Sequence, residues 1–393
     1  MNEVWIAGAA RTPIGSFQGS YREVTAVELG TIAIQEACSR AGVAGQQVDQ
    51  VWMGQVLQSG VGQNGARQAA LQAGIPIHAP AAGVNLVCGS GLQTVMLGVQ
   101  NIRTGDADMV VAGGMENMTQ SPYILKQARQ GYKYGHGELL DTVLHDGLTC
   151  AFLKQPMGVT AERLAERYQI TRDMQDDYAL RSQQRAEAAM RAGKFEAELV
   201  HVRVPERKGT YRIVDTDEHP RHGLTLEALS KLNPAFIANG TVTAGNSSGI
   251  NDGAAAVVLC SSKAGVKRNL SPLAIVRGYA AVGVEPEWMG LGPVSALKKA
   301  VAKAGLRMQD IELFEINEAF ASQVLAVVEE LSIDTENVNV NGGAIALGHP
   351  IGASGTRVLV SLLHEMERRN VKYGAAALCV GGGHGVAVIV ERG

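Results

Sequence analysis

Short apolar segments alternate with amphipathic stretches along the first part of the chain. Residues 4–7 and 48–56 are apolar runs of the length typical of buried strands. Between them, residues 25–41 place apolar side chains at helical spacing, and Gly42 follows where a helix commonly ends. Strands that alternate with helices predict an α/β fold with a mostly parallel sheet that is covered on both faces.

The pattern of the N-terminal region returns near the C-terminus. Three pairs of segments match in the same order, at offsets of 263, 264 and about 268 positions. They are residues 41–51 and 304–313, residues 89–91 and 353–355, and residues 107–114 and 376–383. We interpret the matches as a duplicated unit of roughly 115 residues, because chance rarely gives three matches at a nearly constant spacing.

Residues 119–248 interrupt this repeat. Thr160 and Thr171 are predicted to cap amphipathic helices over residues 160–168 and 171–192, and Gly193 is placed to end the second helix. We therefore expect an N-terminal half at 1–118, to which about 249–269 return, a loop domain at 119–248 and a C-terminal half at 270–393.

Composition narrows the possible classes of protein. The 393 residues are 46% hydrophobic and only 19% charged, which excludes disorder for most of the chain. The net charge of −3 gives no global basic field for nucleic acid, and the 5% of aromatic residues argue against a base-stacking platform. The 47 glycines indicate tight turns and close backbone approach.

Five scattered cysteines are odd in number and form no C-x-x-C pair, so neither a disulfide framework nor structural zinc is expected. The N-terminus lacks the basic and apolar regions of a signal peptide, and no apolar stretch approaches the roughly 20 residues of a membrane helix. These features predict a soluble protein without membrane association, in the reducing cytoplasm.

A dinucleotide-like pattern occurs at Gly60-x-Gly62-x-x-Gly65-Ala66, after one predicted strand and before a helix. A dinucleotide site also expects an acidic residue about 20 positions later. No Asp or Glu occurs between Gln50 and Gly105. We therefore favour an ordinary turn and helix start over a nicotinamide or flavin site.

Cys88 lies at a predicted strand-to-helix junction within Asn85-Leu-Val-Cys-Gly-Ser-Gly91. A helix N-terminus favours a thiolate, and the small residues after Cys88 leave its main chain open to a substrate. A buried structural thiol remains an equal alternative at this point.

The second half supplies possible partners for this thiol. His349 lies in a glycine-rich turn before a predicted helix at 354–368, and Cys379 ends a predicted strand before Gly381-Gly-Gly383. Asn317 and Glu318 close another strand. If a pseudo-twofold axis relates the halves, His349 reaches Cys88 and serves as its base, which a thiol with an ordinary pKa of about 8.5 needs.

A cluster of basic residues in the loop domain has two interpretations. Acidic residues are interspersed among the basic ones, so the cluster is either a solvated face of mixed charge or a contact for the phosphates of a ligand. The basic residues are Arg203, Arg207, Lys208, Arg212 and Arg221.

These motifs together resemble the thiolase family. The shared motifs are Cys88-Gly-Ser-Gly, Gly113-Gly-Met-Glu-Asn-Met118, Asn317-Glu-Ala-Phe, Gly348-His-Pro350 and Cys379-x-Gly-Gly-Gly, with Arg11-Thr-Pro-Ile-Gly15 and residues 240–253 extending the likeness to the whole chain. The resemblance implies α/β/α/β/α layers, made of two similar halves with mixed five-stranded sheets, plus a loop domain.

The resemblance also implies a Claisen chemistry with defined roles. Cys88, deprotonated by His349, takes an acyl group from acyl-CoA, and Cys379 removes an α-proton from acetyl-CoA. The enolate is met by His349 and a water on Asn317, and the tetrahedral oxyanion by the N–H groups of Cys88 and Gly381. Glu318 either orients its neighbours or is an ordinary charged residue.

Coenzyme A is a substrate and product in this scheme, and neither a metal nor a redox cofactor is required. The implied contacts to CoA and the acyl group are Leu148, Met157, Arg221, Phe236, Ala244, Ser248, Ala319 and Phe320, although core packing is an alternative for Leu148, Met157 and Phe236 and a surface charge for Arg221. Pro156 replaces a common histidine and His384 occupies a variable position, so chain-length preference is left open.

The resemblance favours condensation of two acetyl-CoA molecules and the reverse thiolysis, within fatty acid metabolism, by a homodimer or homotetramer. Alternatives are a thiolase of broader chain length, a ketoacyl synthase-like enzyme, which typically lacks the second cysteine, and a non-catalytic acyl-CoA-binding relative. The dimer is expected through sheet-edge strands, with further assembly through about 119–145.

Overall fold

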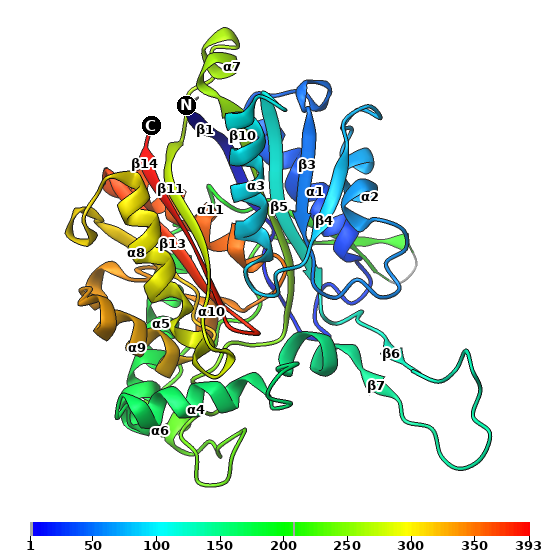
Figure 1. Ribbon diagram of the computed structural model, residues 1–393, viewed down its shortest axis with the longest axis vertical. Helices are drawn as coiled ribbons and strands as arrows, with labels where there is room; N and C mark the ends of the chain where they lie inside the picture. Colours follow the sequence, from blue (N-terminus) through cyan, green and yellow to red (C-terminus); the bar gives the residue numbers. More distant parts are fainter. Residues whose placement is uncertain (1–2, 207–208) are drawn as a thin grey trace.

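Each half of the chain forms a sheet, and the two sheets join edge to edge in the computed structural model, which describes residues 3–206 and 209–393 (Figure 1). The first half holds β1 (Val4–Arg11), β2 (Gly15–Ser16), β3 (Gln50–Gly54), β4 (Ala81–Val84), β5 (Met109–Asn117) and β10 (Asn251–Ser261). The second half holds β11 (Ala274–Gly283), β12 (Leu313–Ile316), β13 (Tyr373–Val380) and β14 (His384–Arg392). The strand order is β12-β13-β14-β11-β1-β10-β5-β3-β4, and β2 pairs with β10.

The strand directions correct the expectation of a mostly parallel sheet. β3 is parallel to β4 and β5, and β12 is parallel to β13. The pairings of β1 with β10, β10 with β5, β11 with β14 and β13 with β14 are antiparallel. The physical reason is that β14 follows β13 in a hairpin and β10 follows the loop domain. Neither β14 nor β10 is therefore reached through a helical crossover. In the described part of the second half, a parallel bridge from Phe314 to Val338 stands where a fifth strand was expected.

Helices lie on both outer faces and between the two sheets. Along β10, the even-numbered residues 254–260 pack with the α1 and α2 side, and the odd-numbered residues 255–259 face the central layer. This alternation buries both faces of the strand and gives five layers, α/β/α/β/α. The layers use α1 (Ala26–Arg40) and α2 (Gly65–Gln72) outside the first sheet, α3 (Ser90–Thr104) and α11 (Ser354–Arg369) in the centre, and α8 (Gly292–Ala304) and α9 (Ala321–Leu331) outside the second.

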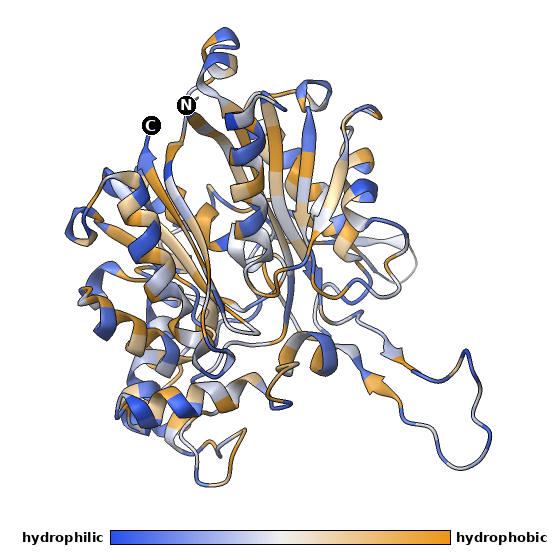
Figure 2. Ribbon diagram, viewed as in Figure 1, coloured by the Kyte–Doolittle hydropathy of each residue, from blue (hydrophilic) through white to orange (hydrophobic). Residues whose placement is uncertain are grey.

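Colouring by hydropathy follows these layers, with apolar residues along the strands and polar residues on outward helix faces (Figure 2). Shorter helical segments complete the two halves and the loop domain. They are α7 (Ser262–Lys267), α10 (Ala344–Leu347), the 3₁₀ segments Gly45–Gln47, Pro286–Leu291, Met308–Asp310 and Thr335–Asn337, and a π-helical turn at Val143–Leu148.

Local capping chemistry sets the bounds of the first helix as predicted. Thr25 accepts a hydrogen bond from the backbone N–H of Glu28, and the Glu28 carboxylate accepts one from the Thr25 N–H. This reciprocal pair is a capping box. Gly42, just after the helix, has φ +65°. The dinucleotide-like pattern is a turn followed by α2, with Asn64 as the N-cap.

Corresponding contacts recur in the two halves. Gly8 of β1 packs so closely on α1 that a Cβ there would lie 2.7 Å from Ala41 Cβ. Gly278 of β11 packs on α8 in the same way, with a Cβ position 3.1 Å from Ala304 Cβ. Both glycines sit at register shifts of their strands. The two strand-helix pairs are therefore built alike.

The loop domain contains an extended two-stranded arm and a helical part. The arm, β6 (Tyr123–Ile124) and β7 (Leu140–Asp141), projects away from the body (Figure 1). The rest consists of α4 (Met157–Arg167), α5 (Arg172–Arg191), the hairpin β8 (Val202–Pro205) and β9 (Tyr211–Val214), and α6 (Leu226–Ser230).

One predicted cap in this domain is wrong and the other is confirmed. Thr171 caps α5, and Gly193 follows it with φ +65°. Thr160, in contrast, lies inside α4, where its hydroxyl donates to Met157 O. The helix begins earlier because Pro156, which lacks an N–H and suits a helix start, occupies the N-cap.

A buried charge cluster ties the loop domain to β1. Arg11 Nε donates to Glu198 at 2.7 Å, and its Nη1 and Nη2 donate to Asp217 at 2.7 and 2.9 Å. All three side chains are buried. Since breaking such a pair leaves an uncompensated charge, this cluster fixes Glu198 and Asp217 of the loop domain against the first half.

The basic cluster of the loop domain lies on the surface where it is described. Arg203 stacks on Tyr211, and Arg212 pairs with Glu206. These contacts fit a mixed-charge face. Arg207 and Lys208 lie outside the described residues.

Candidate active site

Cys88 lies in a strained turn between β4 and α3. The preceding residue, Val87, has φ +43°, an unusual conformation for a β-branched residue. Ser90 holds the turn, because its hydroxyl donates to Val87 O at 2.6 Å and accepts from Leu86 N at 2.9 Å. Asn85 Oδ1 also accepts from Val87 N. A backbone held this firmly in a rare conformation marks Cys88 as a candidate reacting residue.

The Cys88 thiol is half-buried and faces two backbone donors. Burial raises its pKa to about 11, although the N–H groups of Gly381 and of Cys88 itself lower it. The expected stabilisation of a thiolate at the helix N-terminus is therefore outweighed by desolvation. The same two N–H groups are the pair that the family resemblance implies for the tetrahedral oxyanion.

His349 is buried in the turn before α11. Its Nδ1 lies 2.6 Å from Ser354 Oγ, and Ser354 Oγ donates to Pro350 O at 2.9 Å. Because a hydroxyl has one proton, Ser354 then accepts from Nδ1–H, which leaves Nε2 with its lone pair. The backbone N–H of His349 donates to Asn251 Oδ1 at 2.9 Å. Burial lowers the pKa of His349 to about 3, with a further contribution from Arg357.

Asn317 follows β12 and reaches the same imidazole. Its Nδ2 lies 3.5 Å from His349 Nε2, and its backbone N–H donates to Ala377 O at 2.9 Å. The Oδ1 atom of Asn317 is buried and has no hydrogen-bond partner among the described residues. That acceptor is available for a donor in the site, such as a water.

Glu318 orients its neighbours and is not an ordinary charged residue, the alternative that the sequence left open. Its carboxylate is buried and accepts from Tyr178 at 3.0 Å and Ser182 at 2.7 Å. It also accepts from Asn339 Nδ2 at 2.9 Å and from the N–H of Ile345 at 3.1 Å. Glu318 thus anchors the segment that leads to His349.

Cys379 is buried near the end of β13, beside Cys88. Burial raises the pKa of the Cys379 thiol, and the Cys88 thiol raises it further, so the two sulfurs lie within electrostatic reach. The following turn needs glycine, because Gly382 and Gly383 have φ +82° and +91°. A Cβ at Gly383 would lie 2.3 Å from Val284 O. This turn presents the Gly381 N–H to Cys88.

The central helices bring the two halves together at this site. A Cβ at Gly91 of α3 would lie 2.7 Å from Thr356 N of α11, and a Cβ at Gly355 would lie 2.2 Å from Leu92 N. The contact is reciprocal, as a pseudo-twofold axis requires. Since Cys88 precedes α3 and His349 precedes α11, the crossing brings the two turns that carry them to the same junction of the halves.

Five of the contacts that the resemblance implies for CoA and the acyl group lie in the apolar clusters of the two thiols. Met157, Phe236, Ala319 and Phe320 share an apolar cluster with Cys379. Leu148 packs with Cys88 in a neighbouring cluster. The rings of Phe236 and Phe320 meet edge to face, 6.0 Å between centroids. Together they form an apolar wall at Cys379.

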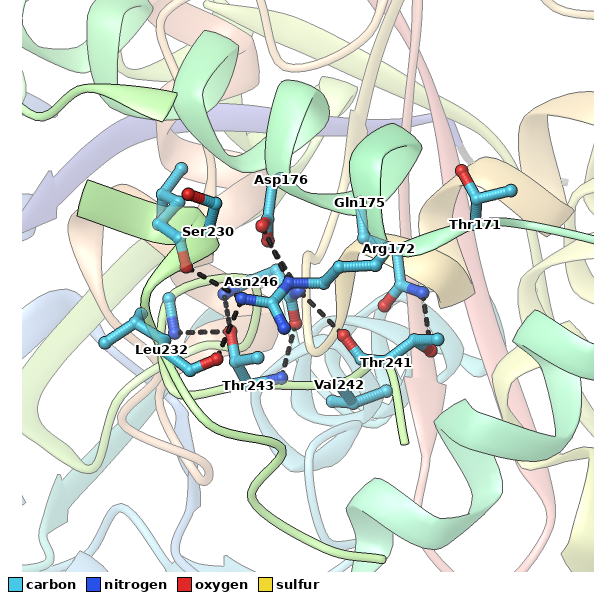
Figure 3. A network of polar contacts seen from close by, with 12 residues as sticks. Thr171, Arg172, Gln175, Asp176, Ser230, Leu232, Thr241, Val242, Thr243 and Asn246 are labelled. Carbon is cyan, nitrogen blue, oxygen red and sulfur yellow. Dashed lines mark hydrogen bonds and ion pairs between the residues drawn. The ribbon is translucent and has the colours of Figure 1, made fainter. Parts of the chain in front are cut away.

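A polar network holds the loop that leads into this wall (Figure 3). Asp176 of α5 accepts from Asn246 Nδ2 at 2.9 Å and from Arg172 Nε at 2.7 Å. Arg172 in turn donates to the carbonyls of Leu229 and Leu232. The loop continues to Ser248, whose N–H donates to Ala319 O at 3.0 Å.

Two of the predicted CoA contacts lie on the surface. Ala244 is exposed in the same loop as Ser248. Arg221 is exposed, and its backbone N–H donates to Gln183 Oε1. Their roles stay predictions.

Several site residues were missed by sequence reasoning. Glu116 accepts from the N–H groups of Val56 and Gly352 at 2.9 Å each, and so links the two halves. Ser354 and Asn251 hold His349. Glu116 lies in the motif at 113–118 and Ser354 lies in the repeated segment at 353–355. Both positions could therefore have been found from the sequence, but their contacts could not.

No group of His, Cys, Asp and Glu side chains able to hold a metal ion occurs among residues 3–206 and 209–393. Over the same residues, no helix has the length and apolar character to cross a membrane.

A duplicated five-layer fold with Cys88, His349 and Cys379 at the junction of its halves defines one class of acyl-transferring enzyme. Residues 4–263 match the thiolase N-terminal domain and residues 270–392 match the thiolase C-terminal domain. The chain belongs to the thiolase family and is an acyltransferase.

Relatives with individual names are similar over the whole chain. An acetyl-CoA acetyltransferase of Chromobacterium violaceum is 55% identical over 390 residues, 99% of this chain and 100% of that protein. One of Cupriavidus necator is 54% identical over 392 residues, 100% of both. Among solved structures, Bacillus anthracis acetyl-CoA acetyltransferase has a TM-score of 0.98 at 46% identity, covering 100% of this chain and 99% of that chain. Human mitochondrial 3-ketoacyl-CoA thiolase has a TM-score of 0.97 at 45% identity, with the same coverage.

Proposed function

We propose that the protein condenses two acetyl-CoA molecules to acetoacetyl-CoA and CoA, and catalyses the reverse CoA-dependent thiolysis, through an acyl group on Cys88. The observation that carries the proposal is the convergence at the Cys88 sulfur. The N–H groups of Cys88 and Gly381 act on it, and Cys379 lies within electrostatic reach. A ketoacyl synthase-like enzyme is disfavoured because Cys379 occupies this position, and a non-catalytic relative because the reacting set is complete.

In the first step, His349 Nε2 takes the proton of Cys88 as the sulfur bonds to the thioester carbonyl carbon of acetyl-CoA. The carbonyl oxygen becomes an oxyanion that accepts from the N–H groups of Cys88 and Gly381. When the carbonyl re-forms, the bond to the CoA sulfur breaks and His349 returns the proton to that sulfur. Acetyl-Cys88 and free CoA remain.

In the second step, the Cys379 proton passes to His349, and the Cys379 thiolate removes an α-proton from a second acetyl-CoA. The enolate oxygen accepts from His349 and from a water held by Asn317 Oδ1, the atom without a partner among the described residues. The α-carbon attacks the Cys88 thioester and the bond to Cys88 breaks. His349 gives its proton to the Cys88 sulfur, so all three side chains return to their starting state.

The acetyl preference rests on the names of the most similar relatives and on the wall of Phe236 and Phe320 beside Cys379. A broader chain-length range is the second candidate, favoured by the fold match to a 3-ketoacyl-CoA thiolase. Pro156, at the start of α4 beside Met157, removes a histidine common in acetoacetyl-type enzymes.

The test is thiolysis of a chain-length series of 3-ketoacyl-CoA substrates with free CoA, followed by loss of enolate absorbance. We expect kcat/KM to be highest for the four-carbon substrate and to fall as the chain lengthens. Equal values for long chains would support the broader thiolase, and no turnover with any chain would refute the proposed function.

We also propose that the protein works in the cytoplasm as a homodimer or homotetramer within fatty acid metabolism. The five cysteines are all free. Strand β4 is paired with β3 at the end of the sheet order, which leaves an edge for a second copy. The arm exposes large apolar side chains, among them Tyr123 and Tyr134, which suits further assembly.

A further inference from the structure

Phe236, one of the two rings of the apolar wall, is carried on a short hairpin at the surface of the loop domain. An antiparallel backbone bridge between its two ends closes this segment, the Phe236 hairpin (residues 234–243). Residues 237–239 at its tip are exposed, whereas Phe236 is partly buried and packs against the cluster of Cys379. A surface hairpin of this kind needs anchors to keep its inward ring in one place.

The first anchor is Glu162 of α4, whose side chain is buried against the base of the hairpin. Its carboxylate accepts from the Thr241 N–H at 2.9 and 3.0 Å, from the Thr241 hydroxyl at 2.9 Å and from the Val242 N–H at 2.9 Å. Gly240 allows this close approach, because a Cβ there would lie 2.2 Å from Glu162 Oε1. The carboxylate therefore fixes the hairpin backbone to α4.

The second anchor is the surface of α4 at Gly158. A Cβ at Gly158 would lie 2.2, 2.3 and 2.4 Å from three carbon atoms of the Phe236 ring, so the ring lies directly on the helix backbone. Gly158 and Glu162 are about one helical turn apart and share one face of α4. The same helix face thus holds both the ring and the hairpin that carries it.

Helix α4 also connects the two aromatic rings of the wall. Ser322, in the first turn of α9, donates to Ala161 O of α4 at 3.0 Å. Phe320 lies at the start of α9, and its ring meets that of Phe236 edge to face at 6.0 Å. Because both rings are placed relative to one helix, a small change on α4 alters the apolar space beside Cys379.

We propose that Glu162 and Gly158 are positioning residues that set the acyl-chain length accepted by the site, because they hold the Phe236 ring against α4. This inference rests on the proposed function, in which the acyl group lies beside Cys379. Both residues act through Phe236 and not by contact with the substrate. In an apolar pocket, one methylene group changes kcat/KM by about 10–200-fold, so a small displacement of the ring is enough to alter the preference.

The experiment measures kcat/KM for thiolysis of four-carbon and eight-carbon 3-ketoacyl-CoA substrates and compares their ratio between variants. In Glu162→Ala the hairpin loses its hydrogen bonds to α4 and the ring moves aside. The four-carbon to eight-carbon ratio should therefore fall by about tenfold or more. Glu162→Gln should keep the wild-type ratio, because its amide oxygen accepts from the two N–H groups and its amide nitrogen donates to the Thr241 hydroxyl.

Gly158→Ala should change the ratio in the opposite direction. The added Cβ displaces the Phe236 ring from α4 toward the cluster of Cys379, so the eight-carbon substrate should lose more activity than the four-carbon one. In a Phe236→Leu background the overlap with the ring is removed. The same Gly158→Ala change should then leave the ratio of Phe236→Leu unaltered.

The matched control is Glu166→Ala, which removes an exposed carboxylate from the next turn of α4. This variant should keep the wild-type rate and ratio. A merely structural role of Glu162 would lower kcat/KM by the same factor for both chain lengths, and Glu162→Gln would not restore the ratio.

The proposal is overturned if folded Glu162→Ala or folded Gly158→Ala keeps the wild-type ratio, or if Glu162→Gln behaves like Glu162→Ala. If Glu162→Ala does not fold, Gly158→Ala and its comparison in the Phe236→Leu background decide. Unchanged ratios in variants of an active enzyme would refute this inference alone. A wild-type protein without thiolysis of any chain would refute the proposed function on which the inference rests.

Discussion

The Cys88 thiol faces two backbone N–H groups, yet burial raises its pKa to about 11. His349 is shifted in the opposite direction, to about 3, by burial and by Arg357. Desolvation disfavours the charged form of each group, so the resting pair is a neutral thiol and a neutral imidazole. Nucleophile and base therefore exchange a proton only when a substrate carbonyl is present.

This resting state predicts the pH dependence of alkylation at Cys88. Only the thiolate reacts with iodoacetamide, and its fraction rises tenfold per pH unit below the pKa. The rate constant for labelling of Cys88 should therefore climb steeply between about pH 6 and pH 9. Mass spectrometry of the Cys88 peptide measures it, with Cys88→Ala as the control. A rate that is flat across this range would indicate a thiolate-imidazolium pair instead.

At this scale the sequence predicted candidate reacting side chains that the fold brings to one junction, because Cys88, His349 and Cys379 stand in short glycine-rich motifs. It missed residues that hold them in place. Asn251 and Ser354 lie in a strand and a helix, and they reach His349 only in the folded chain. A shift in pKa caused by burial has no local pattern in the sequence.

Among the elements, the crossing of α3 and α11 depends on Gly91 and Gly355. In Gly91→Ala, a Cβ would lie 2.7 Å from Thr356 N, so the helices must separate and both catalytic turns move. We expect a loss of about 1–3 kcal/mol in unfolding free energy from overpacking, together with a lower kcat. Denaturant unfolding and thiolysis rates measure the two effects.

The matched control is Gly283→Ala at the end of β11, where a Cβ would meet nothing within 4 Å. This variant should behave like the wild type in both assays. Equal stability of Gly91→Ala and Gly283→Ala would contradict the role of the close crossing.

The Arg11 cluster gives a second prediction for the elements. Asp217→Ala removes the acceptor of two guanidinium bonds and of the Ile14 N–H, and leaves a buried charge partly unpaired. The expected cost in unfolding free energy is about 3–5 kcal/mol. Glu227→Ala, which breaks the exposed pair with Lys231, should change it by less than about 1 kcal/mol. Similar costs in chemical denaturation would show that the cluster does not hold the loop domain.

Helix ends were predictable where the cap is local, as at Thr25 and Thr171. Thr160 was wrongly assigned because Pro156 provides an earlier start that a search for hydroxyl caps overlooks. The expected parallel sheet failed for a different reason. Strand direction is set by the connection that precedes each strand, and β10 and β14 arrive from a long insertion and from a hairpin.

For the whole molecule, the duplication explains why one site draws on both halves. The internal repeat was visible in the sequence, and the reciprocal contacts of Gly91 and Gly355 agree with it. The division of the chain at 118, 248 and 270 stays a prediction. The thiolase domain matches cover 4–263 and 270–392.

Assembly supplies a prediction at this scale. Replacing residues 126–138 of the arm with a short Gly-Ser linker should remove the exposed Tyr132 and Tyr134 and convert a tetramer into a dimer, because the edge of β4 is untouched. Light scattering coupled to size exclusion gives the mass of the particle. An unchanged mass would show that the arm takes no part in the assembly of the subunits.

The most direct measurement of the central claim is the mass of Cys88→Ala and Cys379→Ala after mixing each with acetyl-CoA. Cys379→Ala should gain one acetyl group on the Cys88 peptide and form no acetoacetyl-CoA, because acylation needs only Cys88 and His349. Cys88→Ala should remain unlabelled. Near-normal condensation by Cys379→Ala, or a stable acetyl group on Cys88→Ala, would contradict the account.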